Sequence, residues 1–391
     1  MVRAKGIWAT CAAVFSIFTL FSYGAAGNLH VGPLRIHPYA TVSAAHTDNV
    51  YLTRADRVSD TFFLISPGVE LLLPMKKNAL SFNYTADSYN YREEKKADRT
   101  VHNATGTLSL NQWKRLKVQA RDGFTRGADR PYFKGDQTHP FTWNSPGLSV
   151  DYDLNRWLGV GAAYTGETKK YDRSLDQIDD YKGTELTGSL YLKMLPKTSL
   201  VASYGYRTRS YDNRESEDSY SNRIEGGITW EIAAKSTGTA RVGYMRTDYH
   251  RLSRSDSAFS YLISITHRLR PKTTLSVEGV RRILDTSRAD RNLAFGSGYV
   301  STQIRATLSH RYRKLTGRLK VGYIHDEYLH DDSGLGKKRK DDLYTGELSV
   351  DHALRRWLRL GGAYRYTRLN SNFPAEEYGE NTIMIYVSLI L

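Results

Sequence analysis

Apolar and polar residues alternate at every second position over most of the chain. In the segment 158–165, Leu, Val, Ala and Tyr occupy the even positions, while Gly, Gly, Ala and Thr occupy the odd ones. In the last segment, 382–391, Ile, Ile, Val, Leu and Leu occupy the odd positions. A period of two is the signature of a β-strand with one apolar face. The pattern therefore predicts an all-β protein.

Short polar connections separate the alternating segments at regular intervals. They recur roughly every 40 residues, the length of two long strands with their connections. The eight short connections are Pro74-Met75-Lys76-Lys77, Asn111-Gln112-Trp113-Lys114, Asp153-Leu154-Asn155-Arg156, Pro196-Lys197, Ala233-Ala234-Lys235, Pro271-Lys272, Arg313-Lys314 and Leu354-Arg355-Arg356. Between them lie longer charged or Asn/Ser-rich segments, namely 92–99, 127–138, 214–218, 286–292 and 331–342.

Counting the segments predicts a transmembrane up-and-down antiparallel β-barrel of about eighteen strands. Both chain ends would lie on the short-turn side, and nine longer loops would lie on the other side. Strands of roughly ten residues have the length that a tilted strand needs to cross a bilayer. Strict alternation of short and long connections matches the periplasmic turns and external loops of bacterial outer-membrane barrels.

A soluble β-solenoid or propeller is the alternative, because the repeat length overlaps that of a propeller blade. A blade, however, contains four short strands rather than two long ones. Four tryptophans, Trp113, Trp157, Trp230 and Trp357, stand beside short turns, and tyrosines gather toward the opposite strand ends. These positions favour aromatic girdles at two membrane interfaces, with the tryptophans on the periplasmic side.

One turn-and-strand unit occurs twice, as VDYDLNRWLGVGAAYTGE at 150–167 and as VDHALRRWLRLGGAYRYT at 350–367. In this reading Trp157 and Trp357 lie at the headgroup level and the leucines that follow face lipid. Gly161 and Gly361 would place no side chain on the inner face of the barrel. The repetition is then structural and not catalytic.

The first 27 residues, MVRAKGIWATCAAVFSIFTLFSYGAAG, have basic residues, an apolar run and then small residues. This arrangement predicts a secretory signal peptide that is cleaved at Ala26 or Gly27, with an uncleaved anchor as the alternative. Cys11 is the one cysteine of the chain and lies within it, so no disulfide is expected in the mature protein. Residues 28–391 show no linker and are expected to form a single outer-membrane β-barrel domain.

The formal net charge of +15 and the mean hydropathy of −0.53 are unusual for a soluble enzyme. Such basicity would suggest nucleic acid as the partner of a cytoplasmic protein. Export makes that partner improbable, so the charge is assigned to the barrel itself and no nucleic acid is expected.

Charged strand residues should face inward, because Arg or Lys costs about 2 to 4 kcal/mol when it faces lipid at the bilayer midplane. The alternation assigns ten cations to the pore lining: Lys117, Arg121, Arg207, Arg209, Arg241, Arg305, Arg318, Lys320, Arg359 and Arg365. It assigns five acids to the same face: Asp87, Glu185, Glu225, Glu278 and Glu347. These charges either neutralise one another in a water-filled or loop-plugged interior, or give the pore a positive field that concentrates anions.

Enzymatic motifs are missing from the sequence, which has no P-loop, no Gly-x-Ser-x-Gly elbow and no helix with metal-spaced histidines. No catalytic residues, metal site or cofactor are therefore expected. The His/Asp residues between His325 and Asp332 could bind a metal weakly, but a solvated loop is the simpler reading. Asp176, Asp179 and Asp180 do not have the spacing of an EF-hand.

Residues 30–391 resemble the putative β-barrel porin 2 family of bacterial, Gram-negative outer-membrane proteins. The resemblance rests on the entry segment His46-Thr47-Asp48-Asn49-Val50, on the hairpin period and on the Asn/Arg-x-Trp-Leu turn units. It implies a link to exopolysaccharide export, with a periplasmic polysaccharide export protein as a partner. The chain departs from the usual barrel pattern by ending in Leu391 rather than an aromatic residue, which implies weaker recognition by the barrel-assembly machinery.

The function that we expect is an outer-membrane conduit for export of an exopolysaccharide, anionic in one version of the hypothesis. The alternatives are a general or anion-selective solute porin and a plugged structural or adhesive barrel. An eighteen-strand barrel has the size of a porin. The segment before the first strand is too short for a plug domain, although the loop from Gly127 to Pro140 could fold inward.

Overall fold

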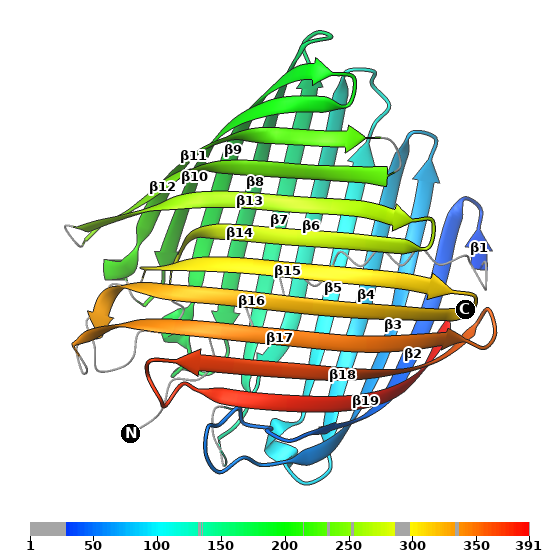
Figure 1. Ribbon diagram of the computed structural model, residues 1–391, viewed down its shortest axis with the longest axis vertical. Coiled ribbons are helices and arrows are strands. Elements are labelled where there is room, and N and C mark those ends of the chain that lie inside the picture. Colours follow the sequence, from blue (N-terminus) through cyan, green and yellow to red (C-terminus); the bar gives the residue numbers. More distant parts are fainter. Residues whose placement is uncertain are drawn as a thin grey trace.

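The structure is a computed structural model that describes residues 29–131, 134, 136–213, 215–232, 235–251, 254–285, 298–332 and 336–390. The predicted signal peptide lies outside the described residues. Most described residues belong to long strands that form one closed wall (Figure 1).

The strands follow the sequence order around the barrel. They are β1 (Leu29–Val31), β2 (Leu34–Thr47), β3 (Asp60–Met75), β4 (Asn78–Tyr91), β5 (Arg99–Leu110), β6 (Leu116–Asp129), β7 (His139–Asp153), β8 (Leu158–Tyr171), β9 (Tyr181–Leu195), β10 (Thr198–Tyr211), β11 (Ser219–Ile232), β12 (Ser236–Tyr249), β13 (Arg254–Arg270), β14 (Thr273–Asp285), β15 (Gly298–Tyr312), β16 (Leu315–Asp332), β17 (Lys337–Ala353), β18 (Leu358–Ser371) and β19 (Tyr378–Ile390).

Each strand from β2 to β19 pairs antiparallel with its sequence neighbour, and β19 pairs back onto β2. The closing register runs from Thr382 opposite Thr47 to Ile390 opposite Tyr39. The prediction of an all-β antiparallel barrel with eighteen strands is therefore confirmed. Strand β1 is a short addition that forms a hairpin with β2, and Gly32 in its turn has a φ of +59°.

All eight predicted short connections separate consecutive strands. Lys76 and Arg313 have φ values of +55° and +50°, which allow two-residue hairpin turns. The expectation of a loop over Asp331–Asp342 is wrong, because β16 and β17 continue to pair there and Asp331 lies opposite Lys338. The predicted loop 286–292 lies outside the described residues.

The eight short turns carry twelve basic residues and no acidic residue between the strand ends. We call these residues the turn ring: Lys76, Lys77, Lys114, Arg115, Arg156, Lys197, Lys235, Lys272, Arg313, Lys314, Arg355 and Arg356. All twelve side chains are exposed.

Three of the long loops contain a single helical turn each, namely η1 (Lys95–Ala97), η2 (Gln177–Asp179) and η3 (Glu215–Glu217). In the part of the chain that the structure describes, no helix is long and apolar enough to cross a bilayer. Among the described residues, buried apolar side chains form three clusters near the loop end of the barrel. The largest cluster contains Val50, Tyr51, Phe62 and Tyr91, all within the loop end of the barrel.

The repeated unit at 150–167 and 350–367 has a concrete role in the wall. Gly361 lies opposite Asp351 on the neighbouring strand, and the ring of Tyr386 from β19 covers this glycine. The Tyr386 hydroxyl donates to the Asp351 carboxylate. In the first copy, Tyr191 of β9 covers Gly161 in the same way. The glycines therefore accommodate an aromatic ring on the inner face.

Candidate channel lumen

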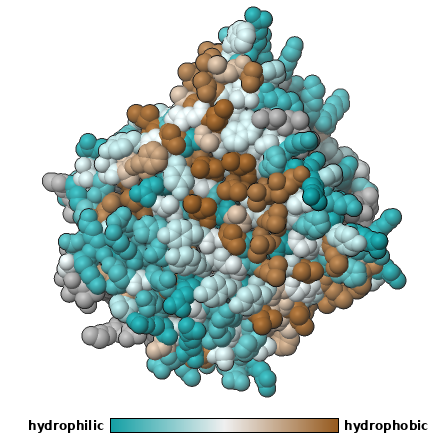
Figure 2. All heavy atoms as spheres, viewed as in Figure 1, coloured by the Kyte–Doolittle hydropathy of each residue, from teal (hydrophilic) through white to brown (hydrophobic). Residues whose placement is uncertain are grey.

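The outer face of the wall is apolar in a band across the strands. Leu319, Leu348, Ile383 and Ile385 are 44%, 54%, 60% and 66% exposed. In Figure 2 apolar side chains gather across the middle of the visible wall, with hydrophilic side chains toward its edges. An apolar surface of this extent is unstable in water but is what a lipid-facing barrel wall needs.

The strand alternation of the structure places all ten predicted cations and all five predicted acids on the inner face. Arg305, for example, follows Ile304, which is 46% exposed, and lies opposite Glu278 in the register of β14 and β15. Arg241 precedes the outward Val242, and Arg359 precedes the outward Leu360. The outer strand ends hold many further charged residues that the alternation alone did not single out.

Two arginines in the outer half of the lumen form a network of ion pairs that spans several strands. Arg209 lies 3.0 Å from Glu167 on β8 and 3.6 Å from Asp285 on β14. Arg207 lies 3.5 Å from Asp285. Tyr181 and Trp143 both donate hydrogen bonds to Glu167. These arginines are therefore neutralised by acids and hold the wall together.

A second cluster lies beside the first and centres on Arg223 of β11. Its guanidinium lies 2.7 Å from Glu185 and 3.5 Å from Glu225. Ser260 of β13 donates to Glu225 at 3.3 Å. Two of the predicted acids are therefore brought together by an arginine that the sequence analysis did not select.

In the third cluster Glu347 of β17 binds two predicted cations at once. Lys320 lies 2.9 Å and Arg365 3.0 Å from its carboxylate. Nearby, Arg318 lies 3.0 Å from Asp351. Half of the predicted cations are thus ion-paired, counting Arg207 and Arg209 of the outer half.

Three predicted cations make no ion pair with any residue that the structure describes: Lys117, Arg241 and Arg305. Lys117 lies opposite Asp151 in the strand register, and Arg305 lies opposite Glu278, but neither side chain is within ion-pair distance of the acid that it faces. Cations without an ion pair leave more of their electric field in the lumen than ion-paired cations, whose field is largely cancelled by the acid beside them. The turn ring lies at the same end of the barrel and adds further positive charge.

The loop between β6 and β7 enters the lumen, as the sequence analysis allowed for the segment 127–140. Arg130 donates to Glu380 on β19 at 2.8 Å, although β6 and β19 are separated by four strands. The Glu380 carboxylate raises the pKa of Arg130 above its ordinary value and so keeps it charged. Glu380 also accepts from Thr47. The loop is therefore fastened to β19, across the width of four strands.

The loop end of the β14–β15 hairpin also leans inward. Pairing between β13 and β14 stops at Arg281, and beyond it β14 pairs with β15 only. Ile283 is 1% exposed and packs in a cluster with Met245 of β12. Asp285 reaches the arginines of β10 and accepts from Ser219 of β11 at 3.4 Å. Two elements thus narrow the outer half of the lumen from different sides.

Tyrosines at the strand ends fall into two groups. Tyr204, Tyr244 and Tyr364 are 49%, 56% and 44% exposed and face outward, consistent with an interface girdle. Tyr91 and Tyr211, by contrast, are buried on the inner face. The interpretation of the whole set as a girdle is therefore wrong for the second group, because these rings pack under the loops.

The buried tyrosines begin a recurring loop clasp. The backbone N–H of Tyr91 donates to Asp98, and the backbone N–H of Tyr211 donates to Asp218, at 2.6 and 2.8 Å. Tyr171 and Asp180 form the same bond at 2.7 Å. One carboxylate thus satisfies the first free amide of each loop and fixes the loop against the wall.

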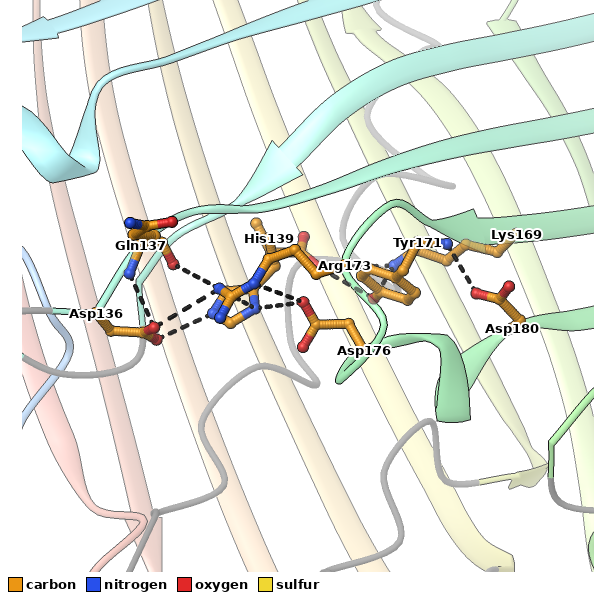
Figure 3. A network of polar contacts seen from close by, with 9 residues as sticks. Asp136, Gln137, His139, Lys169, Tyr171, Arg173, Asp176 and Asp180 are labelled. Carbon is orange, nitrogen blue, oxygen red and sulfur yellow. Dashed lines mark hydrogen bonds and ion pairs between the residues drawn. The ribbon is translucent and has the colours of Figure 1, made fainter.

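A buried histidine joins two neighbouring loops (Figure 3). The Nδ1 atom of His139 lies 2.8 Å from Asp176, and its Nε2 atom lies 3.0 Å from Asp136. Arg173 approaches both carboxylates, at 3.6 and 3.7 Å. The network joins the end of the β6–β7 loop, where β7 begins, to the β8–β9 loop.

The predicted girdle tryptophans lie at the turn end of the barrel. Trp113, Trp157 and Trp357 are 46%, 54% and 47% exposed. Trp230 differs, because its indole packs over Gly238 and donates to Ser236 at 3.1 Å.

The described residues contain no group of three or more His, Cys, Asp or Glu side chains that could hold a metal ion. His325 and Asp326 alternate on β16 and so point to opposite faces. His325 contacts Asp342, whereas His330 contacts Asp256 of β13. The reading of this segment as a solvated loop is wrong, because these residues lie within a strand.

Solved barrel structures are similar to this chain at low sequence identity. A BenF-like porin from Pseudomonas fluorescens Pf-5 is 11% identical, with a TM-score of 0.48 and coverage of 91% of this chain and 99% of that chain. OccAB3 from Acinetobacter baumannii is 10% identical, with a TM-score of 0.46 and coverage of 91% and 99%. The copper transporter OprC is 12% identical at a TM-score of 0.47, and the match covers 90% of this chain and 64% of OprC.

A comparison with curated proteins gave no match. The model of the family described as "Putative beta-barrel porin 2" matches residues 22–390, nearly the whole chain. Together with the closed eighteen-strand wall and its apolar outer band, this match identifies an outer-membrane barrel. The chain belongs to the putative beta-barrel porin 2 family.

Proposed function

We propose that this barrel is an outer-membrane channel for anionic solutes, and that its foremost cargo is an acidic polysaccharide leaving the cell. The observation that carries the proposal is the set of inner-face cations without ion pairs, Lys117, Arg241 and Arg305. They lie in the wall of an eighteen-strand barrel, and barrels of this size enclose water-filled channels.

The electrostatic argument favours anions over neutral cargo. A low-dielectric wall lined with charge of one sign focuses its field into the lumen and raises the local concentration of the opposite charge. Arginine can also bind a carboxylate through two parallel hydrogen bonds. Uronic acids and similar acidic sugars would meet such groups repeatedly along the lumen.

The outer half of the lumen favours an extended chain over a bulky solute. The β6–β7 loop and the β14–β15 hairpin both enter it, held by Arg130 and Asp285. A polysaccharide is narrow and flexible and could thread past these elements. Delivery of the polysaccharide to the turn end of the barrel would require a periplasmic polysaccharide export protein, which we propose as a partner.

Planar-bilayer recording tests this proposal. The purified barrel should conduct with a preference for chloride over potassium, and oligogalacturonate should reduce the current more strongly than a neutral glucose oligosaccharide of equal length. A deletion strain should lose surface polysaccharide. Normal surface polysaccharide with impaired uptake of small anions would instead support the second candidate, an anion-selective solute porin.

A plugged structural barrel is the third candidate, and the Arg130–Glu380 contact is the observation that favours it. A barrel in which residues 130–138 are replaced by Gly-Ser-Gly distinguishes a plugged structural barrel from a channel. A barrel that stays non-conducting after this replacement would favour a structural role over a channel.

A further inference from the structure

The turn ring is a surface of one charge sign, with twelve basic residues and no acidic residue in the turns. Its twelve cations are exposed, and none of them forms an ion pair with a residue that the structure describes. Several cations of the opposite rim have acidic partners. Arg54 lies 3.2 Å from Glu377, Lys95 lies 3.9 Å from Asp98, and Arg251 is paired with Glu215.

The ring lies at the level of a membrane interface. Trp113, Trp157 and Trp357 belong to the same turns and are exposed, as interface tryptophans are. The guanidinium of Arg156 lies 4.9 Å from the centre of the Trp157 ring. Side chains at this level can reach lipid phosphates, and basic clusters next to a membrane span attract anionic lipids.

We propose that the turn ring binds the phosphate groups of anionic phospholipids in the periplasmic leaflet of the outer membrane. Each of the eight turns contributes at least one cation, so the charge encircles the barrel. A partner that surrounds the barrel fits this distribution better than a protein docked on one side. Arg115 and Arg156 can each bridge two phosphate oxygens. The inference depends on the membrane orientation and not on the cargo.

Native mass spectrometry of the purified barrel in neutral detergent tests the proposal, with phosphatidylglycerol as the probe and phosphatidylcholine as the neutral comparison. The test variant replaces six ring cations with glutamine and leaves Lys76 and Arg313 untouched, because their φ values are positive. The six substitutions are Lys77→Gln, Lys114→Gln, Arg115→Gln, Lys272→Gln, Arg355→Gln and Arg356→Gln.

The matched control removes six cations from the opposite rim. It carries Arg54→Gln, Arg57→Gln, Arg92→Gln, Lys95→Gln, Lys96→Gln and Arg251→Gln. We expect the ring variant to retain about half of the phosphatidylglycerol that the unmodified barrel retains, because it keeps half of the ring charge. The control should retain the full amount, and phosphatidylcholine retention should not change.

Heat-modifiable gel mobility verifies that both variants are folded. If the ring variant does not fold, the two-residue variant Arg355→Gln/Arg356→Gln replaces it, with a smaller expected loss. Unchanged phosphatidylglycerol retention in a folded ring variant would overturn the proposal. If oligogalacturonate added from the turn side also reduced the channel current of this ring variant less than that of the unmodified barrel, the ring would instead belong to the cargo entrance.

Discussion

The ring of Tyr386 on β19 lies over Gly361 on β18, and its hydroxyl binds Asp351 on β17. Three neighbouring strands are thus joined on the inner face by one aromatic side chain. A methyl group at position 361 would collide with this ring. We expect Gly361→Ala to lower the free energy of unfolding by about 1 to 3 kcal/mol, the usual cost of overpacking.

The matched control for this prediction is the adjacent Gly362→Ala. A Cβ at position 362 would meet only the carbonyl oxygen of Met384, at an ordinary contact distance of 3.5 Å. Urea unfolding in lipid vesicles, followed by tryptophan fluorescence, compares the two variants. Equal stability of the Gly361→Ala and Gly362→Ala variants would contradict the proposed packing of Tyr386 over Gly361.

The Tyr–Asp loop clasps should stabilise the outer loops. Asp180 is 6% exposed and accepts from the Tyr171 backbone. Asp180→Ala leaves a buried amide without an acceptor, which costs about 1 to 3 kcal/mol. We expect faster proteolysis within 172–180 in the folded barrel. Asp180→Asn, which keeps an acceptor oxygen, should be cleaved at nearly the normal rate; equally rapid cleavage would argue against the clasp.

The inner and outer faces can be distinguished by one pair of substitutions on β16. Val321 faces outward and is 48% exposed. Val321→Arg should cost about 2 to 4 kcal/mol near the midplane and should impair assembly. Lys320→Gln changes an inner residue and should leave heat-modifiable mobility intact. The opposite outcome for the two variants would reverse the assigned faces.

The sequence was sufficient for features that depend on neighbouring residues. Strand alternation and turn position are local, so the strand number, the short turns and the inward direction of Arg241 could be predicted. The partner of Arg209 could not, because Asp285 is many residues away and approaches only when the β14–β15 hairpin leans inward. The contact of Arg130 with Glu380 could not be predicted for the same reason, because the two residues are far apart in the sequence.

Burial also explains why the tyrosines were misassigned in part. Tyr171, at the end of β8, is buried under a loop, whereas Tyr204, in the middle of β10, faces outward. The alternation separates them, because Tyr171 shares the inner face of β8 with Gly161, whereas Tyr204 shares the outer face of β10 with Leu200. The signal for the inner group was the aspartate that follows Tyr91 and Tyr211 by seven residues.

The inward loop should limit the current through the channel. Arg130→Ala removes the contact with Glu380 and should release the β6–β7 loop from β19. We expect a higher single-channel conductance and more frequent transitions. Lys134→Ala is the control, because the Lys134 side chain is 71% exposed and lies 3.9 Å from Glu94. Identical conductance of Arg130→Ala and the unmodified barrel would show that this contact does not restrict the pore.

The central claim is that unneutralised cations make the lumen prefer anions, and the reversal potential in a potassium chloride gradient tests it most directly. The unmodified barrel should prefer chloride. The triple variant Lys117→Gln/Arg241→Gln/Arg305→Gln should lose most of this preference, with the largest change at low salt, because screening acts over about 8 Å at physiological ionic strength. A folded barrel that prefers potassium, or a triple variant with unchanged chloride preference, would contradict the claim.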